Sequence, residues 1–445
     1  MGNICKGLIV FAVGVILWFL PAPVGLKPQA WHMFAIFAAT ILGFVLTPLP
    51  LGAMAIISLA IASALEVAKL PDLLSGISST VIWLIVSAFM FSKALTKTGL
   101  GRRLAFLIMR SIGDSSLKLG YAIVLSDLLI APATPSNTAR NGAIMFPLVR
   151  SLCSAFGSDP KTNPRKIGSY LMQLGFHGDQ TTTTMFLTAG SINLVMVSVA
   201  SKLLNIDVSW GMWAVAAVVP GIISLIVIPY LIYKIDKPEV KETPEIKDIA
   251  QRELDQMGSV KREEKITGFI FVVTLLLWAT TTITRIDAAV TALIGFAAML
   301  IFNVLKWADV LEEKHAWDAL VWMGTLIGMA GMLQTTGLMP WFGKFISGAI
   351  SGVSWPIGLF VLAFINVFSM YFFASLNAHT AALFPAFLTV AVSIGTPPML
   401  AMLTLAVSSS IPASLTNYST GPAPIYFGAG FVTQKTWWIV GFIVT

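Results

Sequence analysis

A polar stretch in an otherwise apolar chain carries side chains that suit the binding of an anion. Residues 132–147 contain three prolines, the sequence Ser136-Asn137-Thr138, and Arg140. Hydroxyl and amide groups donate hydrogen bonds to carboxylate oxygens, and a guanidinium attracts negative charge. Backbone that leaves the helix at membrane depth is tolerated only where protein or a water-filled cavity satisfies it, and a charged residue there indicates a functional site. This stretch therefore predicts a binding site for a small anion.

A weaker copy of this stretch occurs in the second half of the chain. Residues 375–385 begin Ser375-Leu-Asn377 and continue to His379 and a proline. In both copies the serine is followed four residues later by a residue that can carry positive charge, Arg140 or His379. The sequence leaves open whether His379 stays neutral, gains and loses a proton, or stays positively charged.

Two further polar breaks, 188–193 and 416–424, lie in apolar segments, and we predict that all four breaks converge near the middle of the membrane. Unwound helices offer free N–H groups and helix N-termini to an anion. The predicted substrate-binding residues are Ser136, Asn137, Thr138, Thr188, Ala189, Gly190, Ser191, Ser375, Asn377, Thr420, Gly421 and Pro422.

Each of these side chains also has a purely structural interpretation. A serine or threonine in a membrane helix can simply bond backbone or a neighbouring helix, and Arg140 could extend from a helix end to the interface. His177 and Asp179 could form a proton relay or half of a metal site, but two residues in a glycine-flanked segment favour a structural or gating role. Lys93, Asp127 and Asp287 are expected near helix ends or in ion pairs.

The composition predicts that the elements positioning these residues are membrane helices. Hydrophobic residues make up 56% of the 445 and charged residues 11%, whereas soluble chains carry about 25% charged residues. The net charge of +7 is dispersed over loops, which fits anionic lipid better than nucleic acid. The two cysteines give no metal or disulfide pattern, and we expect no cofactor and no metal. Uncharged runs of about 20 residues or more, the length of a span, occur at 7–26, 28–65, 73–92, 180–201, 208–233 and 266–284.

The two halves of the chain show the same features in the same order. Thr98-Gly-Leu100 recurs as Thr336-Gly-Leu338, and the charged segment 234–265, with 8 basic and 9 acidic residues, separates the halves. Residues 97–118 carry five Lys or Arg, whereas 335–356 carry only Lys344. The positive-inside tendency then predicts opposite orientations, and inverted repeats with broken helices are typical of secondary transporters.

At these residues the chain resembles the divalent anion/sodium symporter family over nearly its whole length. The resemblance rests on Ser136-Asn-Thr138, Pro48-Leu-Pro-Leu-Gly52, Ser375-Leu-Asn-Ala-His379 and Asn417-Tyr-Ser-Thr-Gly-Pro-Ala-Pro-Ile-Tyr-Phe-Gly428. The last three are similar to the branch of plastid 2-oxoglutarate/malate translocators and bacterial citrate/succinate and tartrate/succinate exchangers.

The resemblance implies an all-α polytopic protein of the cell membrane: an inverted-repeat, elevator-type homodimer with about 11 transmembrane helices and two re-entrant hairpins per protomer. Scaffold helices are expected at 1–118 and 266–354, transport-domain elements at 119–203 and 355–430, a connecting helix at 204–233, a cytoplasmic linker at 234–265 and a last helix at 431–445. The implied substrates are C4–C6 di- and tricarboxylates.

One departure from the family pattern predicts the type of transport. Sodium-coupled members repeat Ser-Asn-Thr at the second hairpin, but here Leu376 stands where the asparagine would be. We interpret Arg140 and His379 as built-in cations that replace sodium, which predicts sodium-independent obligatory exchange, of 2-oxoglutarate against malate, fumarate or succinate. Sodium- or proton-coupled uptake and a channel are the alternatives. We expect no enzyme activity, because Ser375 lacks a nucleophile setting and no acidic residue occurs from 345 to 434.

Overall fold

The chain packs as two units, each made of segments that are distant in sequence. The computed structural model describes residues 2–349 and 354–445, and all the secondary-structure elements of this part of the chain are helical. Unit 1 comprises residues 1–86, 192–208 and 314–409, and unit 2 comprises 87–191, 209–313 and 410–445. This division by packing does not follow the predicted scaffold and transport segments, which stay a prediction.

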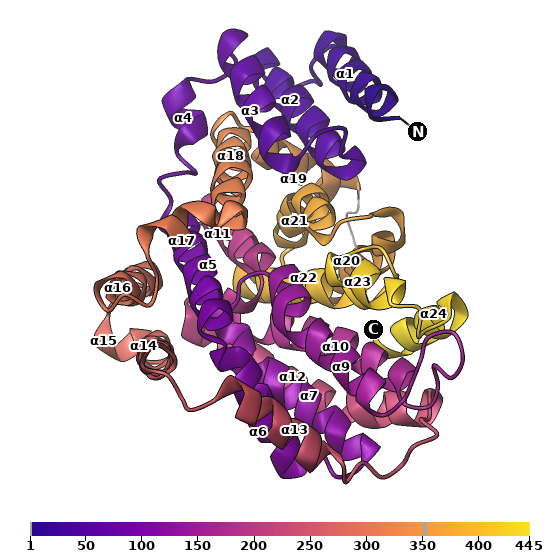
Figure 1. The fold of residues 1–445 in the computed structure, drawn as a ribbon. Coiled ribbons are helices and arrows are strands. Elements are labelled where there is room, and N and C mark those ends of the chain that lie inside the picture. Colours follow the sequence, from indigo (N-terminus) through magenta and orange to yellow (C-terminus); the bar gives the residue numbers. More distant parts are fainter. Residues whose placement is uncertain (1, 350–353) are drawn as a thin grey trace. The chain divides into compact units, whose positions relative to one another are not determined.

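Unit 1 contains the N-terminal helices, α11 and the helices from α18 to α22. Its helices α1, α2 and α3 pack side by side, α18 packs on α3 and α4, and α19 packs on α21 (Figure 1). A Cβ at Gly328 of α18 would lie 1.9 Å from the carbonyl oxygen of Leu73, so only glycine allows α4 to approach this closely. The bounds are α1 Asn3–Phe19, α2 Pro28–Leu46, α3 Leu51–Ala64, α4 Leu70–Leu74, α11 Ser191–Leu204, α18 Lys314–Thr335, α19 Leu338–Ala349, α20 Trp355–Phe368, η4 Ser369–Phe372, α21 Leu376–Ser393 and α22 Pro398–Ser410.

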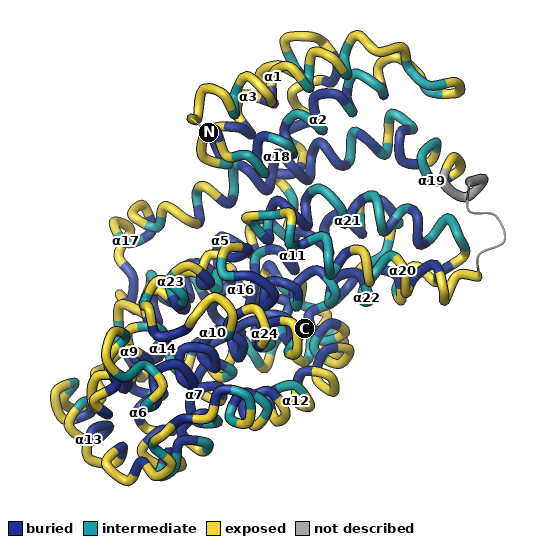
Figure 2. The backbone as a smooth tube through the Cα atoms, turned by 90° about the vertical axis from the view of Figure 1, so that its right-hand side faces the viewer, coloured by how far each residue is buried: buried dark blue, intermediate teal, exposed yellow. Residues whose placement is uncertain are grey.

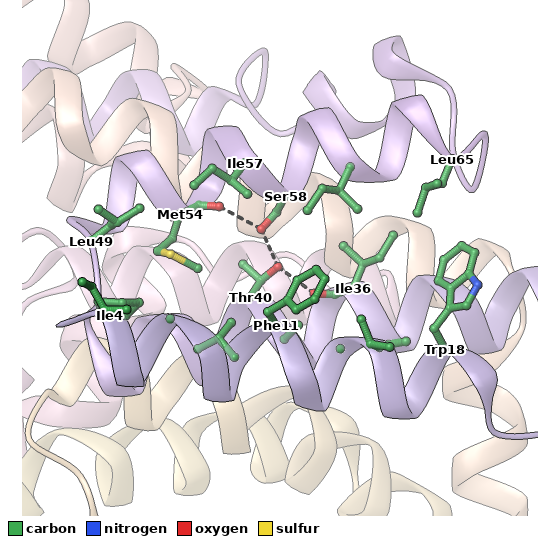
Figure 3. A pocket seen from close by; sticks show the side chains of 18 of the residues that line it. Ile4, Phe11, Trp18, Ile36, Thr40, Leu49, Met54, Ile57, Ser58 and Leu65 are labelled. Carbon is green, nitrogen blue, oxygen red and sulfur yellow. Dashed lines mark hydrogen bonds between the residues drawn. The ribbon is translucent and has the colours of Figure 1, made fainter. Parts of the chain in front are cut away.

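An apolar groove of about 640 Å³ lies among α1, α2 and α3 (Figure 3). The hydroxyls of Thr40 and Ser58 are 2.6 Å apart in it, and each also lies within 2.8 Å of a carbonyl oxygen of its own helix. Both hydroxyls thus have partners, and the other lining side chains are nearly all apolar. The groove offers no cation for an anionic substrate.

Unit 2 is built around α10, in which every residue except Thr181 is buried (Figure 2). Helices α7, α9 and α12 pack against α10. The bounds are α5 Thr80–Thr98 (shared with unit 1), α6 Leu100–Ile112, α7 Ser116–Ile130, η1 Ala131–Ala133, α8 Asn137–Arg140, the π-helical turn η2 Asn141–Met145, α9 Phe146–Ala155, α10 Gly168–Met185, η3 Leu187–Ala189, α12 Trp210–Ile235, α13 Ile246–Met257, α14 Arg262–Ala279, α15 Thr281–Thr284, α16 Ala288–Ile301, α17 Trp307–Glu312, η5 Ile411–Leu415, α23 Pro422–Gly428 and α24 Gln434–Val444.

The predicted cytoplasmic linker is partly helical, and its helix α13 is docked rather than free. Helices α6 and α13 lie side by side, and α13 turns Ile246, Ile249, Ala250 and Leu254 to the buried side (Figure 1). The bidentate, buried pair of Arg103 with Glu264 joins α6 to the start of α14 at 2.5 and 3.2 Å. The prediction of a part-helical linker is confirmed, but one face of α13 is shielded from solvent.

Eight helices of the described residues are long and apolar enough to cross a membrane, and four shorter apolar helices accompany them. The chain is therefore a multi-pass membrane protein. The predicted number of about 11 spans is not settled by this count and stays a prediction.

The order of elements recurs in the two halves. Helix α5 ends before Gly99 and α6 follows, just as α18 ends before Gly337 and α19 follows. Both glycines have positive φ, +79° and +90°, which favours glycine over residues with a side chain. After each pair come a helix with a 3-10 end (α7–η1 and α20–η4) and a helix capped by serine (α8 and α21).

Candidate functional site

The first break separates α7 from the helix that begins at Asn137. Helix α7 runs into the 3-10 turn η1, which contains Pro132, and the chain is extended at Ser136. The Ser136 hydroxyl accepts a hydrogen bond from the Ala139 N–H at 3.2 Å, which caps the new helix. Ser136 and Asn137 are half-buried, and Thr138 is exposed. The predicted hairpin tip is therefore a capped helix N-terminus with side chains that a ligand could reach.

Arg140 lies directly behind this tip and is completely buried. Its Nε donates to Asp127 on α7 at 2.9 Å, and its Nη2 donates to Asp179 on α10 at 2.5 Å. Further contacts of 2.8–3.4 Å reach the side-chain and carbonyl oxygens of Thr134, the carbonyl oxygen of Ala189, and the hydroxyls of Thr182 and Thr183. One side chain thus ties together α7, the first break, α10 and η3.

The interpretation of Arg140 as a built-in cation included no counter-ions, and the structure places two beside it. Two carboxylates, Asp127 and Asp179, contact one guanidinium, and all three side chains are buried. Burying a charge in a membrane is costly unless an opposite charge compensates it. The two carboxylates therefore neutralise the positive charge of Arg140, and this charge is not available to neutralise a substrate.

The second break of unit 2, at 188–191, is bonded to the first. The Thr188 hydroxyl donates to the Pro132 carbonyl oxygen at 2.7 Å and accepts from the Trp210 indole N–H at 3.1 Å. The Ser191 N–H donates to the Pro135 carbonyl oxygen at 2.6 Å. The Thr188 hydroxyl is thus better placed to hold the two breaks together than to bind a substrate.

The break at 416–424 lies against the hairpin tip. The Asn137 amide donates to the Thr420 hydroxyl at 3.4 Å. A Cβ at Gly421 would lie 2.0 Å from the Thr138 hydroxyl oxygen, so the two segments approach more closely than any other residue at Gly421 would permit. Three of the side chains predicted to bind substrate, those of Asn137, Thr138 and Thr420, therefore come together here.

A second contact between the same segments lies one turn further on. The Tyr426 hydroxyl of α23 donates to the Asn141 side-chain oxygen at 2.8 Å, and its ring packs edge-on against Phe146. Asn141 opens the π-helical turn η2, a feature that occurs frequently at functional sites. Neither Tyr426 nor Asn141 was predicted from the sequence.

The break at 375–380 belongs to unit 1, and among the described residues it takes part in no ion pair. The Ser375 hydroxyl accepts from the Ala378 N–H at 3.3 Å, as Ser136 does from Ala139. The buried His379 is 2.8 Å from the Ser369 hydroxyl through Nε2, and within the described part of the chain its Nδ1 has no hydrogen-bond partner. The Asn366 amide donates to the hydroxyls of Ser408 and Ser409 at 3.1 and 2.9 Å.

The two clusters occupy matching places in the two halves. Arg140 and His379 are 239 positions apart, and so are Asp127 and Asn366 (379 − 140 = 366 − 127 = 239). A guanidinium between carboxylates in the first half thus corresponds to an imidazole beside an amide and hydroxyls in the second.

The structure brings three of the four predicted breaks together in unit 2, and the convergence of all four stays a prediction. Sequence reasoning placed Asp127 near a helix end or in an ion pair; the structure shows an ion pair, with Arg140, which the sequence analysis did not name as its partner. It also grouped Asp179 with His177, whereas His177 pairs with Gln173 at 3.3 Å. The sequence did contain a signal for the partners of Arg140. An arginine within apolar segments needs a counter-ion, and Asp127 and Asp179 are the acidic residues of the apolar stretches in 119–203.

These features define a membrane transporter with broken helices, and comparison with known proteins gives its family. Residues 2–445 match the family described as the sodium:sulfate symporter transmembrane region. The chain belongs to this family, the divalent anion/sodium symporters, as the resemblance implied.

Relatives of known name are similar over nearly the whole chain. YflS of Bacillus subtilis is 45% identical over 98% of this chain and 92% of its own. The chloroplastic dicarboxylate transporter 1 of Arabidopsis thaliana is 41% identical over 98% of this chain and 78% of its own. The L-tartrate/succinate antiporter of Escherichia coli is 35% identical over 97% and 93%. These relatives include dicarboxylate transporters, and bacterial inner-membrane relatives agree with a place in the cell membrane.

A solved structure shares the fold at low sequence identity. MtrF of Neisseria gonorrhoeae matches with a TM-score of 0.54 and 13% identity, over 99% of this chain and 93% of its own. At this identity the similarity concerns the fold alone.

Proposed function

We propose that this protein is a sodium-independent antiporter that exchanges C4–C6 dicarboxylates such as 2-oxoglutarate, malate, fumarate and succinate. The observation that carries the proposal is the contact between the capped hairpin tip at Asn137 and Thr138 and the break at Thr420 and Gly421. The names of two relatives, a dicarboxylate transporter and a tartrate/succinate antiporter, support the substrate class and the exchange mode.

The substrate ligands in this proposal are donors from broken helices. Thr138 is exposed beside the N-terminus of α8, and Asn137 and Thr420 are within hydrogen-bond distance of each other. Helix N-termini and neutral hydrogen-bond donors stabilise a carboxylate although they carry no formal positive charge. The proposal keeps Ser375 and Asn377, at the start of α21 in unit 1, as the ligands predicted from the sequence for the second carboxylate.

Sodium independence is supported by what fills the space behind the first tip. Asp127 and Asp179 carry the carboxylate oxygens that would suit a hard cation, but Arg140 already engages one oxygen of each. At the second tip Leu376 supplies no oxygen from its side chain. The proposal therefore differs from the sequence-based one in the role of the two side chains. Arg140 replaces sodium as a structural cation, whereas His379 adds a neutral or charged hydrogen-bond donor.

The exchange mode no longer rests on a permanent positive charge, since two carboxylates compensate Arg140. It rests instead on the relative named as an antiporter. The proposal retains an elevator motion of a transport domain against a scaffold, inverted repeats and a homodimer, in line with the family resemblance.

Reconstitution into liposomes tests this function directly. Uptake of labelled 2-oxoglutarate is measured into empty vesicles and into vesicles preloaded with malate, each with and without external sodium. We expect uptake only into loaded vesicles and no response to sodium. Thr138→Ala should reduce this uptake at least tenfold, whereas Thr162→Ala, on an exposed loop, should leave it unchanged.

Sodium-coupled symport is the second candidate, because the matched family is described by sodium:sulfate symport. Uptake into empty vesicles that depends on an inward sodium gradient would establish it and refute exchange. Uptake into empty vesicles driven by an inward proton gradient would refute exchange in favour of proton coupling. Flux that ignores both the gradients and the internal substrate would indicate a channel.

A further inference from the structure

Tyr426 reaches from α23 to the turn that follows the hairpin tip. Its side chain is completely buried, and its hydroxyl donates to the side-chain oxygen of Asn141 at 2.8 Å. The ring packs edge-on against Phe146 of α9, and a Cβ at Gly175 of α10 would lie 2.9 Å from both its Cε1 atom and its hydroxyl oxygen. Packing against α9 and α10 therefore restricts the ring and aims the hydroxyl at Asn141.

The side-chain amide of Asn141 connects Tyr426 to the hairpin tip. Its nitrogen donates to the carbonyl oxygen of Asn137 at 2.9 Å, and a carbonyl oxygen can only accept. The nitrogen must therefore face Asn137 and the oxygen must face Tyr426, whose hydroxyl is then the donor. The two hydrogen bonds depend on each other, because the amide cannot rotate to another partner without breaking both.

A second contact joins the same two segments and closes a ring of hydrogen bonds. The side-chain nitrogen of Asn137 donates to the Thr420 hydroxyl at 3.4 Å, and Thr420 and Tyr426 belong to the same segment of the chain. Since the Thr420 hydroxyl accepts this bond, its own hydrogen can still be donated to a ligand. The ring therefore holds two side chains of the proposed substrate site through the buried Tyr426 and Asn141.

We propose that Tyr426 and Asn141 are positioning residues of the substrate site, which hold the hairpin tip at Asn137 against the break at Thr420. Both side chains are completely buried, so they act on a substrate through Asn137 and Thr420. Loss of the Tyr426 hydroxyl leaves the buried Asn141 oxygen without its donor, and the amide can then rotate away from Asn137. The two segments are then less well preorganised for a carboxylate, and the affinity falls. This inference rests on the proposed function, because it concerns the affinity for dicarboxylate.

A purely structural role of the Tyr426 hydroxyl would give a different result. A buried hydrogen bond also stabilises the fold, and its loss alone would lower the unfolding temperature without changing the affinity for substrate. Tyr121 provides the matched control, because its hydroxyl donates to the Ile226 carbonyl oxygen at 2.7 Å, elsewhere in unit 2. Tyr121→Phe removes one hydrogen bond of similar length and leaves the ring at the hairpin tip intact.

The test compares Tyr426→Phe, Tyr121→Phe and the wild type in proteoliposomes preloaded with malate. Uptake of labelled 2-oxoglutarate is measured over a range of concentrations, which separates the half-saturating concentration from the maximal rate. In Tyr426→Phe the half-saturating concentration should rise about three- to tenfold, the range expected for the loss of one hydrogen bond. The maximal rate should change less than this, and Tyr121→Phe should match the wild type in both. Purified Tyr426→Phe should also be protected less by 2-oxoglutarate against thermal unfolding.

A double mutant tests whether the two side chains act as a unit. Asn141→Ala should raise the half-saturating concentration at least as much as Tyr426→Phe does. Adding Tyr426→Phe to Asn141→Ala should then cause no further rise, because the hydroxyl acts only through Asn141. Effects of the two changes that multiply independently would overturn the proposal.

Other outcomes also decide the matter. Wild-type affinity in Tyr426→Phe, with a lower unfolding temperature, would leave the hydroxyl a structural role only and overturn the proposal. Affinity that Tyr121→Phe weakens equally would do the same. Should Tyr426→Phe fail to fold, wild-type affinity in Asn141→Ala would still refute the inference. If none of the proposed dicarboxylates is taken up by the wild type or protects it from unfolding, the proposed function fails and the inference fails with it.

Discussion

At the scale of single residues, the close approach of Gly421 to Thr138 sets the width of the space beside the hairpin tip. The gap is narrower than a methyl group needs, since a Cβ at Gly421 would lie 2.0 Å from the hydroxyl oxygen and 2.7 Å from the methyl carbon of Thr138. Both atoms belong to a short β-branched side chain with little freedom to move away. Any side chain at Gly421 must therefore displace the tip.

Gly421→Ala should consequently lower transport by at least tenfold through a weaker apparent affinity for dicarboxylate. Gly428→Ala is the matched control, because it lies at the other end of α23 and a Cβ there meets nothing within 4 Å. Uptake measured over a range of substrate concentrations separates affinity from maximal rate. Equal affinity in Gly421→Ala and the wild type would contradict the proposed contact.

At the scale of elements, the docked helix α13 makes the linker between the halves a structural part of unit 2. It is held on α6 by its apolar face and by Arg102 with Glu253, and the buried pair of Arg103 and Glu264 closes the end of the linker. Removing one member of a buried pair leaves the other charge unpaired, at a cost of about 3–5 kcal/mol.

Glu264→Ala should therefore loosen the end of the linker and expose α13 to proteases. Limited trypsin digestion of the purified protein should cleave residues 234–265 several times faster than in the wild type. Glu263→Ala serves as the control, because Glu263 is the neighbouring residue and is exposed. If both variants are cut at the wild-type rate, the pair of Arg103 and Glu264 does not hold the linker in place.

At the scale of the whole molecule, the charge asymmetry of the two halves predicts which ends of the helices face the cytoplasm. The α6 segment carries Arg102, Arg103 and Arg110, whereas the matching α19 segment carries only Lys344. From the positive-inside tendency we expect these segments to lie on opposite sides of the membrane.

Cysteine labelling tests this orientation. In a background in which Cys5 is replaced, since it is exposed, and the buried Cys153 is kept, Arg110→Cys and Lys344→Cys add one reporter each. A membrane-impermeant maleimide added to intact cells should label Lys344→Cys but not Arg110→Cys, and permeabilised cells should label both. Labelling of both variants in intact cells, or of neither, would argue against an inverted repeat.

The sequence predicted the elements better than the contacts. The serine-capped starts of α8 and α21 and the positive-φ glycines Gly99 and Gly337 between consecutive helices depend on local rules, so their positions could be inferred. The partners of Arg140 could not be chosen, because Asp179 is 39 positions away and reaches it only through helix packing. The partner of Thr188 could not be chosen for the same reason, because the Pro132 carbonyl oxygen lies 56 positions earlier.

The difference between the two matching clusters also constrains how this protein can evolve. In the first half, any single change at Asp127, Arg140 or Asp179 alters the balance of charges in a buried place. In the second half, His379 and Asn366 contact hydroxyls, so a single change can exchange one neutral group for another. We therefore expect relatives with different substrates to differ mainly in the residues around His379. In the cluster around Arg140 we expect substitutions only in pairs that keep the charges balanced.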